Sequence, residues 1–371
     1  MEFLSLFLLA FMPVLQVLLV GLVGAFLASG CLNILSSSAR NDINKIAFVV
    51  FVPSLVFASL AKTVTARDLV SWWFMPINVG LTFLIGGVLG WVAVKILKPQ
   101  RHLEALVIAC CSAGNLGTMP LIIIPAICDQ DGNPFGDSEV CHVRGIAYVS
   151  FSMALGNLFI WTHTYNLIKS SSKSENNQER EALLLLPSSS TDSIRSKWKE
   201  TAYALIKELL APPTTASILG FIVGSVPWLK ALFVGDKAPA KVVQDSVTLL
   251  GEGAVPCTII ILGSNLTQGL RKCAVKPAVI AAIICVRYVM LPLFGIAVVK
   301  AAEHQGFLPQ SPLYQYVLLI QFTLPPAMSI GTMAQLFDQC KEECSVIFLW
   351  TYLAAALSMT VWSMVFMSMV S

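Results

Sequence analysis

Two apolar segments of this chain are interrupted by residues that weaken a helix, and such interruptions can bind an anion. They read LEALVIACCSAGNLGTMPLIIIPAIC at 103–128 and QFTLPPAMSIGTMAQLF at 321–337. The interrupting residues are Gly114, Asn115, Gly117, Pro120, Pro325 and Pro326. Glycine adds backbone freedom and proline removes an amide donor, so helical hydrogen bonding should stop there. The amides of the resulting half-helices would carry positive partial charge toward a bound anion. Ordinary proline kinks, relieved by neighbouring helices, are the alternative.

Two asparagines within apolar segments could donate hydrogen bonds to a carboxylate. Asn115 is inside the first interruption and Asn265 follows AVPCTIIILG at 254–263. An amide holds an anion without the desolvation cost that a buried arginine would add, which suits a site that must also release its ligand. Hydrogen bonding between helices is the other role open to both.

Glu252 and Arg287 are the two charges deepest within apolar segments. An isolated charge in a hydrocarbon layer is costly enough to imply a partner or a water-filled cavity. The sequence therefore predicts an ion pair between them, with either a structural role or a role in ion coupling.

The chain carries no pattern typical of an enzyme or of a metal site. It has no HExxH helix, paired intramembrane aspartates or serine–histidine arrangement. Its ten cysteines lack zinc spacing, and most read as small packing residues. A net charge of +3, without a basic run, argues against nucleic-acid binding. We expect no enzymatic activity, no metal and no cofactor.

The composition of the chain predicts that most of its residues lie in lipid. Of the 371 residues, 56% are hydrophobic and only 12% are charged. Apolar runs of about 20 residues recur, and that length crosses a hydrocarbon layer of about 30 Å as a helix. The sequence predicts an all-α polytopic membrane protein of about ten spans: 6–29, 43–61, 72–97, 103–128, 145–168, 214–234, 242–266, 277–299, 313–337 and 344–370.

A polar linker divides these spans into two sets of five. Residues 169–200 are rich in Ser, Asn, Glu and Lys and lack a core-forming pattern. Residues 1–168 form the first five-helix repeat and residues 201–371 the second. Short echoes connect them: FVPSLVFASL at 51–60 with AVPCTIIILG at 254–263, GWVAVK at 90–95 with GIAVVK at 295–300, and GNLGTMP at 114–120 with MSIGTMA at 328–334. An odd number of spans per repeat inverts the second half, which is the plan of many secondary carriers.

The distribution of lysine and arginine predicts the orientation. With the termini outside the cytosol, sixteen of these residues fall in cytosolic loops and seven in the opposite loops. Positive charge stays on the cytosolic side during insertion, so the linker should be cytosolic. The non-cytosolic loop after the fourth span has Cys128 and Cys141 at its ends. A disulfide and two reduced cysteines both fit that spacing.

Three motifs, NDINKIAFVVFVPSLVFASLA, CSAGNLGTMPLIIIPAI and QFTLPPAMSIGTMAQLF, resemble the plant PIN-LIKES branch of the auxin efflux carrier superfamily. The resemblance covers nearly the whole chain. It implies ten helices in two inverted repeats, crossing broken helices in spans four and nine, and elevator-like motion. It also implies the endoplasmic reticulum membrane and movement of auxin (indole-3-acetic acid) from cytosol to lumen, which lowers nuclear auxin signalling. In that membrane, the orientation predicted from lysine and arginine makes both termini lumenal.

The resemblance also carries over individual positions. Asn115 matches the asparagine of the fourth-span crossover in the auxin exporters, and Asn265 matches their seventh-span asparagine. Pro120 and the Pro325–Pro326 pair match the crossover prolines. Asp68, in TARDLVSWW, corresponds to an acidic residue that those exporters pair with a lysine one turn on. Trp72 or Trp73 takes the place of that lysine, so the carboxylate–lysine support is not carried over.

The leading hypothesis is an auxin carrier in the lipid bilayer. Asn115, Asn265 and the half-helix amides would hold the carboxylate, while Val52, Leu55 and Met119 pack against the aromatic body. The alternatives are a carrier of a different organic anion, such as a bile-acid-like or dicarboxylate substrate, and a membrane receptor or scaffold without flux. Driving force, substrate range and oligomeric state are not predicted.

Overall fold

The fold is taken from a computed structural model of the chain, which carries side chains. It describes residues 15, 19–29, 32, 34–63, 65, 70–128, 133–171, 212–235, 238–254, 256–261, 263–264, 275–337 and 339–370. The central linker at 172–200, Asp68 and Asn265 lie outside the described residues. The first predicted span, 6–29, is described mainly over 19–29.

The described residues form helices and contain no β-strand, which agrees with the predicted all-α class. The α-helices are α2 (Ser37–Ile46), α3 (Val52–Thr63), α5 (Phe74–Leu97), α6 (Arg101–Ser112), α7 (Thr118–Cys128), α8 (Ser138–Phe159), α11 (Pro212–Ser225), α12 (Pro227–Phe233), α13 (Lys241–Glu252), α15 (Pro277–Cys285), α16 (Leu291–His304), α17 (Pro312–Ile320), α18 (Ser329–Leu336) and α19 (Lys341–Val370). Three π-helical turns join some of them: η1 (Ala47–Phe51), η2 (Ile160–Thr164) and η3 (Val286–Met290).

Five continuous helices are long and apolar enough to cross a membrane, among the residues described. They cover Ser38–Lys62, Phe74–Leu97, Ser138–Ser171, Pro277–His304 and Lys341–Val370. These helices agree with the second, third, fifth, eighth and tenth predicted spans, because length and hydropathy are what the sequence shows most directly. A total of ten spans remains a prediction.

The fourth, sixth, seventh and ninth predicted spans are divided where the sequence contains helix-weakening residues. Helix α6 ends at Ser112 and α7 begins at Thr118, and α17 ends at Ile320 and α18 begins at Ser329. The sixth predicted span is divided between α11 and α12, directly before Pro227. The seventh turns at Gly253, after α13, and continues as helical residues at 254 and 256–261.

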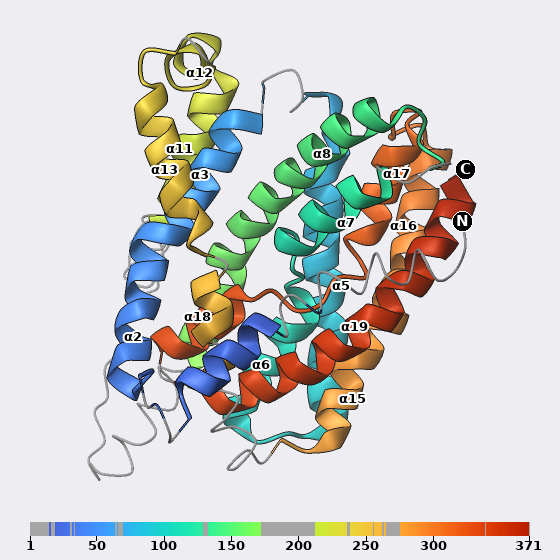
Figure 1. Ribbon diagram of the computed structural model, residues 1–371. Helices are drawn as coiled ribbons and strands as arrows, with labels where there is room; N and C mark the ends of the chain where they lie inside the picture. Colours follow the sequence, from blue (N-terminus) through green and yellow to red (C-terminus); the bar gives the residue numbers. More distant parts are fainter. Residues whose placement is uncertain are drawn as a thin grey trace, which may run out of the picture.

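The helices pack in two sets, which Figure 1 shows on opposite sides of the molecule. The arm consists of α3, α11, α12 and α13, with α3 packed against both α11 and α13. The core bundle consists of α5 to α8 and α15 to α19, where α5 packs against α6 and α17 against α19. Most of the large fully buried side chains, such as Tyr314 and Phe366, belong to the core bundle.

The π-helical turns η1 and η2 contact helices of the arm, whereas η3 contacts helices of the core bundle. Val52 directly follows η1, Ile160 is the first residue of η2, and Arg287 is the second residue of η3. A π turn inserts one residue into a helix and often marks a functional site, because it redirects the side chains around it.

Candidate functional site

The two non-helical segments at 113–117 and 321–328 cross and hydrogen-bond to each other. The Asn115 amide donates to the Pro325 carbonyl at 2.8 Å, and the Ala327 amide donates to the Ala113 carbonyl at 2.9 Å. These bonds form an isolated antiparallel bridge between Gly114 and Pro326. Backbone groups freed by the two interruptions are thereby paired with each other, as a membrane interior demands.

Proline fits this bridge because of the position it occupies. In an antiparallel pair, the residues of a non-hydrogen-bonded pair leave their own amides out of the ladder. Pro326 has this position opposite Gly114, so its missing N–H costs no bond. Pro120 lies in the first turn of α7, where helix amides have no intrahelical acceptor.

A tyrosine from α19 ties the two crossing segments together through its hydroxyl. The Asn115 side-chain amide donates to the Tyr352 hydroxyl at 3.0 Å. The Tyr352 hydroxyl in turn donates to the Pro326 carbonyl at 3.0 Å. Since Tyr352 is only 2% exposed, its hydroxyl is buried, and its two bonds fix the orientation of the Asn115 side chain.

A cavity of about 160 Å³ opens beside this bridge, at the seam between the arm and the core bundle. Its walls are mostly apolar, with a few polar side chains, as expected for a small-molecule site. Residues from both sets line it: Val52, Leu55, Val56, Ala254 and Thr258 from the arm and the residues after it, and Gly114, Asn115, Leu116, Gly117, Met153, Asn157, Ile160, Ala327, Met328, Ser329 and Thr332 from the core bundle.

The structure brings several of the predicted site residues to this cavity. Val52, Leu55 and Asn115 lie in its wall, together with Gly114 and Gly117. Met119 is fully buried and is not among the residues that line the cavity. Their roles in binding remain predictions.

Sequence reasoning missed several polar residues of the site. Asn157, Thr258, Ser329 and Thr332 line the cavity, and Tyr352 lies behind it. Each is one polar residue in an apolar helix, a signal that many packing residues share. Only Ser329 and Thr332 adjoin a predicted interruption, in MSIGTMA, and could have been picked out from that position.

Four helix ends meet around the crossing segments, and they determine the local electrostatics. Helices α7 and α18 begin there, at Thr118 and Ser329, and present the positive ends of their dipoles. Helices α6 and α17 end there, at Ser112 and Ile320, and present carbonyl groups with negative partial charge. Among the described residues that line the cavity, none has a charged side chain.

The predicted ion pair between Glu252 and Arg287 is wrong for this structure. Glu252 is exposed at the end of α13, in the arm, whereas Arg287 is fully buried in the core bundle. The Arg287 guanidinium donates through Nε to the Cys110 carbonyl at 2.7 Å. Depth along the sequence did not reveal that the two charges belong to different sets of helices.

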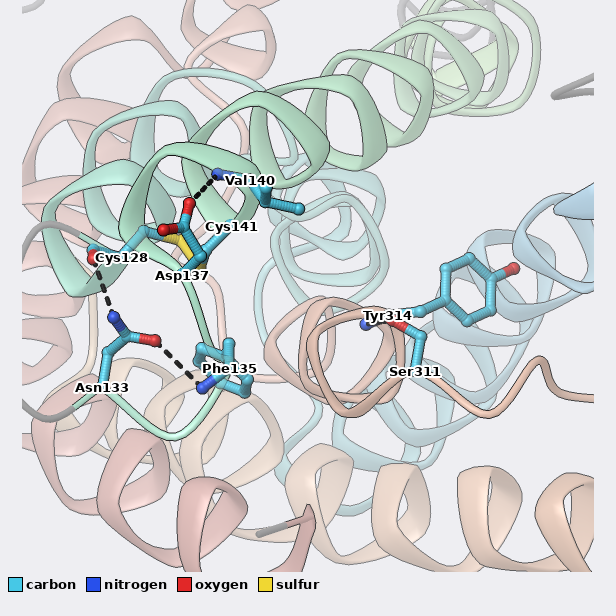
Figure 2. Close-up of a disulfide and its surroundings, with 8 residues drawn as sticks. All are labelled: Cys128, Asn133, Phe135, Asp137, Val140, Cys141, Ser311 and Tyr314. Atoms are coloured by element: carbon cyan, nitrogen blue, oxygen red, sulfur yellow. Dashed lines mark hydrogen bonds between the residues drawn. A yellow bond between two sulfur atoms is a disulfide. The ribbon is translucent and has the colours of Figure 1, made fainter.

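The loop after α7 contains the disulfide that the sequence left open. Cys128 and Cys141 are bonded, with their Cα atoms 5.5 Å apart (Figure 2). Asn133 donates to the Cys128 carbonyl at 3.0 Å, and Asp137 accepts from the Val140 amide at 3.0 Å as the N-cap of α8. Disulfides persist in oxidising compartments, so this bond agrees with a loop on the non-cytosolic side.

The part of the chain that the structure describes holds no group of three or more His, Cys, Asp or Glu side chains placed to bind a metal ion. The cavity beside the bridge offers hydrogen-bond donors, helix ends and an apolar wall. Those features can bind and orient a small molecule.

Comparison with known proteins gives a consistent set of relatives. The model of a family described as membrane transport protein matches residues 9–363. Protein PIN-LIKES 7 of Arabidopsis thaliana is 51% identical over 395 residues, covering 100% of both chains. Protein PIN-LIKES 5 of the same plant is 51% identical over 392 residues, covering 99% of both. Protein PIN-LIKES 3 is 42% identical, again over 100% of both chains.

Proposed function

The chain belongs to the PIN-LIKES group of the auxin efflux carrier-like membrane transport family, and from this membership we propose that it is a secondary carrier of a small organic anion, with indole-3-acetic acid as the leading substrate. The family is one of multi-pass membrane transporters and not of enzymes. The observation that carries the proposal is the cavity beside the bridge between Gly114 and Pro326, where half-helices from both halves of the chain meet.

The residues that line the cavity support a substrate with a carboxylate and an aromatic body. Asn115 supplies a neutral amide donor, and the amide ends of α7 and α18 adjoin the cavity at Gly117 and Ser329. Val52 and Leu55 supply an apolar wall. In this proposal the polar groups orient the carboxylate, while apolar contact with the ring sets the affinity. Asn265 and Asp68, whose roles rest on the family resemblance, lie outside the described residues.

The size and charge of the cavity weigh against the other anions considered. A cavity of about 150 Å³ holds a benzene ring, so about 160 Å³ suits a small aromatic acid better than a four-ring bile acid. A dicarboxylate would bring a second charge, and desolvating an unpaired charge is costly. The lining residues include no cation to meet it.

The two packing sets suggest how the substrate moves. We assign the arm as the scaffold and the core bundle as the moving part of an elevator, in which α6–α7 and α17–α18 are the crossing broken helices. Because the cavity lies between the two sets, displacement of the core bundle would carry the bound anion past the arm. Alternating access by rigid-body motion around a fixed site is general among carriers built from inverted repeats.

We further propose the endoplasmic reticulum membrane, lumenal termini, a cytosolic linker and transport from cytosol to lumen. The charge bias of the loops and the Cys128–Cys141 disulfide support this orientation. The choice of organelle rests on the family resemblance.

Transport by purified protein in liposomes tests the proposal. Uptake of radiolabelled indole-3-acetic acid should be saturable in wild type and strongly reduced in Asn115→Ala. Asn133→Ala is the matched control, because it removes an amide in the disulfide loop, away from the cavity. If the anion crosses alone, a potential positive inside the liposome should accelerate uptake. Stoichiometric binding by folded wild type without turnover would contradict a carrier and favour a receptor.

A further inference from the structure

Arg287 is a buried cation that has no acidic partner within the described parts of the chain. It is 0% exposed, in the middle of the apolar helix Pro277–His304. Its Nε donates to the Cys110 carbonyl, and its Nη2 has no hydrogen-bond partner among the described residues. An uncompensated charge at such depth is expensive, so its retention calls for a counter-charge that binds only part of the time.

Capping a helix end does not by itself explain the charge of Arg287. Cys110 is in the last turn of α6, where carbonyl groups lack intrahelical donors. The corresponding end of α17 is capped without any charge: the Asn78 side-chain amide, from α5, donates to the Leu318 carbonyl at 3.0 Å. Since α5 and the helix holding Arg287 carry the matching GWVAVK and GIAVVK sequences, the two caps come from corresponding helices of the two halves, with Asn78 aligned about one helical turn before Arg287. At α17 a neutral amide is therefore sufficient to cap the helix end.

The guanidinium lies directly behind the wall of the cavity. Gly114 separates the two, because it lines the cavity on one side. On the other side, a Cβ atom added to Gly114 would lie 3.1 Å from Nη1 and 3.8 Å from Nη2 of Arg287. A Cβ atom at this position would crowd the guanidinium and require it to shift by a few tenths of an ångström, so Gly114 lets the guanidinium lie close to the cavity in addition to providing backbone freedom.

Arg287 also changes the balance of charge at the crossing point. The two helix beginnings contribute about +0.5 each and the two helix ends about −0.5 each, so the four dipoles nearly cancel. The described side chains that line the cavity are uncharged. Arg287 therefore gives the crossing point its net positive charge.

We propose that Arg287 is a specificity-determining residue whose guanidinium, held behind Gly114 by the Cys110 carbonyl, makes the cavity selective for anions and is neutralised by the carboxylate of the substrate. This inference rests on the proposed function, because it assigns the counter-charge for the same cavity. The substrate class that follows is a monoanion, matched to one cation, with no need for a co-transported cation to balance it.

A pair of ligands that differ in charge alone tests this role. Binding of indole-3-acetic acid and of its neutral amide, indole-3-acetamide, is measured for wild type and Arg287→Gln, which can still donate to Cys110 but carries no charge. We expect Arg287→Gln to lose about tenfold in affinity for the acid, or about 1.4 kcal/mol, with little change for the amide. Arg287→Lys should retain most of the preference for the acid.

The control variant is Asn78→Ala, which removes the neutral cap from α17. It should lower the unfolding temperature and leave the ratio of the two affinities unchanged. If Arg287→Gln does not fold, Arg287→His provides the same test at pH 8, where an imidazole is uncharged and the preference should be lost.

The outcomes separate the two proposals. An acid preference that survives in Arg287→Gln, or in Arg287→His at pH 8, overturns the role of Arg287 and leaves the carrier intact. Equal loss of both ligands in Arg287→Gln, alongside a folded protein, also overturns it, because the residue would then be structural. Failure of wild type to bind either ligand would contradict the proposed substrate instead.

Discussion

Removing the hydroxyl of Tyr352 should loosen the crossing point and weaken anion binding. The hydroxyl accepts from the Asn115 side chain and donates to the Pro326 carbonyl, both at 3.0 Å. In Tyr352→Phe the buried Pro326 carbonyl loses this donor, and an unsatisfied buried group costs about 1–3 kcal/mol. Asn115 lines the cavity, so water can replace its lost bond. We therefore expect a stability loss of about 1–3 kcal/mol, set by the carbonyl.

The same change should lower affinity for the substrate, because Asn115 is no longer held in one orientation. If fixing that side chain contributes about 1.4 kcal/mol, affinity for indole-3-acetic acid falls about tenfold. Denaturation of the purified protein would give the stability, and ligand binding at equilibrium would give the affinity.

Tyr316→Phe is the matched control for this measurement. The Tyr316 hydroxyl is also buried, and it is bonded to Ser363 Oγ at 2.8 Å, but Tyr316 does not line the cavity. It should lose a similar amount of stability and keep its affinity. Equal effects of the two variants on affinity would refute the reasoning, as would a Tyr352→Phe protein with unchanged stability and binding.

Two further predictions concern packing and covalent structure. A Cβ on Gly24 would overlap the Ile260 carbonyl, so Gly24→Ala should cost about 1–3 kcal/mol of stability. Gly87→Ala should be tolerated, because its Cβ would be 3.9 Å from Ser112 Cβ. Equal denaturation midpoints for the two variants would contradict this prediction. Replacing Cys128 and Cys141 together by serine should cost at most about 3 kcal/mol of stability, from the entropy of the short loop that they close. Uptake of the anion should be unchanged, because neither residue lines the cavity. A gel without reductant confirms the loss of the disulfide, and abolished uptake by a folded variant would contradict the prediction.

The sequence predicted those features that depend on local composition. Five long helices follow from apolar length, and the ends of α6 and α17 follow from glycine and proline in apolar runs. The placement of Val52 and Asn115 at one cavity followed from the family resemblance together with the interruption. Each of these predictions needed only neighbouring residues or a motif.

Features that depend on contacts between distant residues could not be predicted. Tyr352 reaches Asn115 across most of the chain, and Asn78 reaches Leu318 in the other half. Nothing in the periodicity of α19 or α5 marks those positions, because the partner is chosen by packing. The pairing of Glu252 with Arg287 failed for the same reason, since depth in a span does not say which neighbours a helix has.

The bridge between Gly114 and Pro326 has a consequence for biosynthesis. Its two strands of backbone come from opposite halves of the chain, so the ribosome must translate through the ninth predicted span before the site can exist. At about 5–20 residues per second, Gly114 waits on the order of 10 s or more for Pro326. During that interval the polar backbone of the fourth span is without its final partner, so the nascent chain should depend on the insertion machinery or a chaperone to shield it. A truncated N-terminal half would stay in that state permanently, and co-expression of the two halves as separate chains should relieve it.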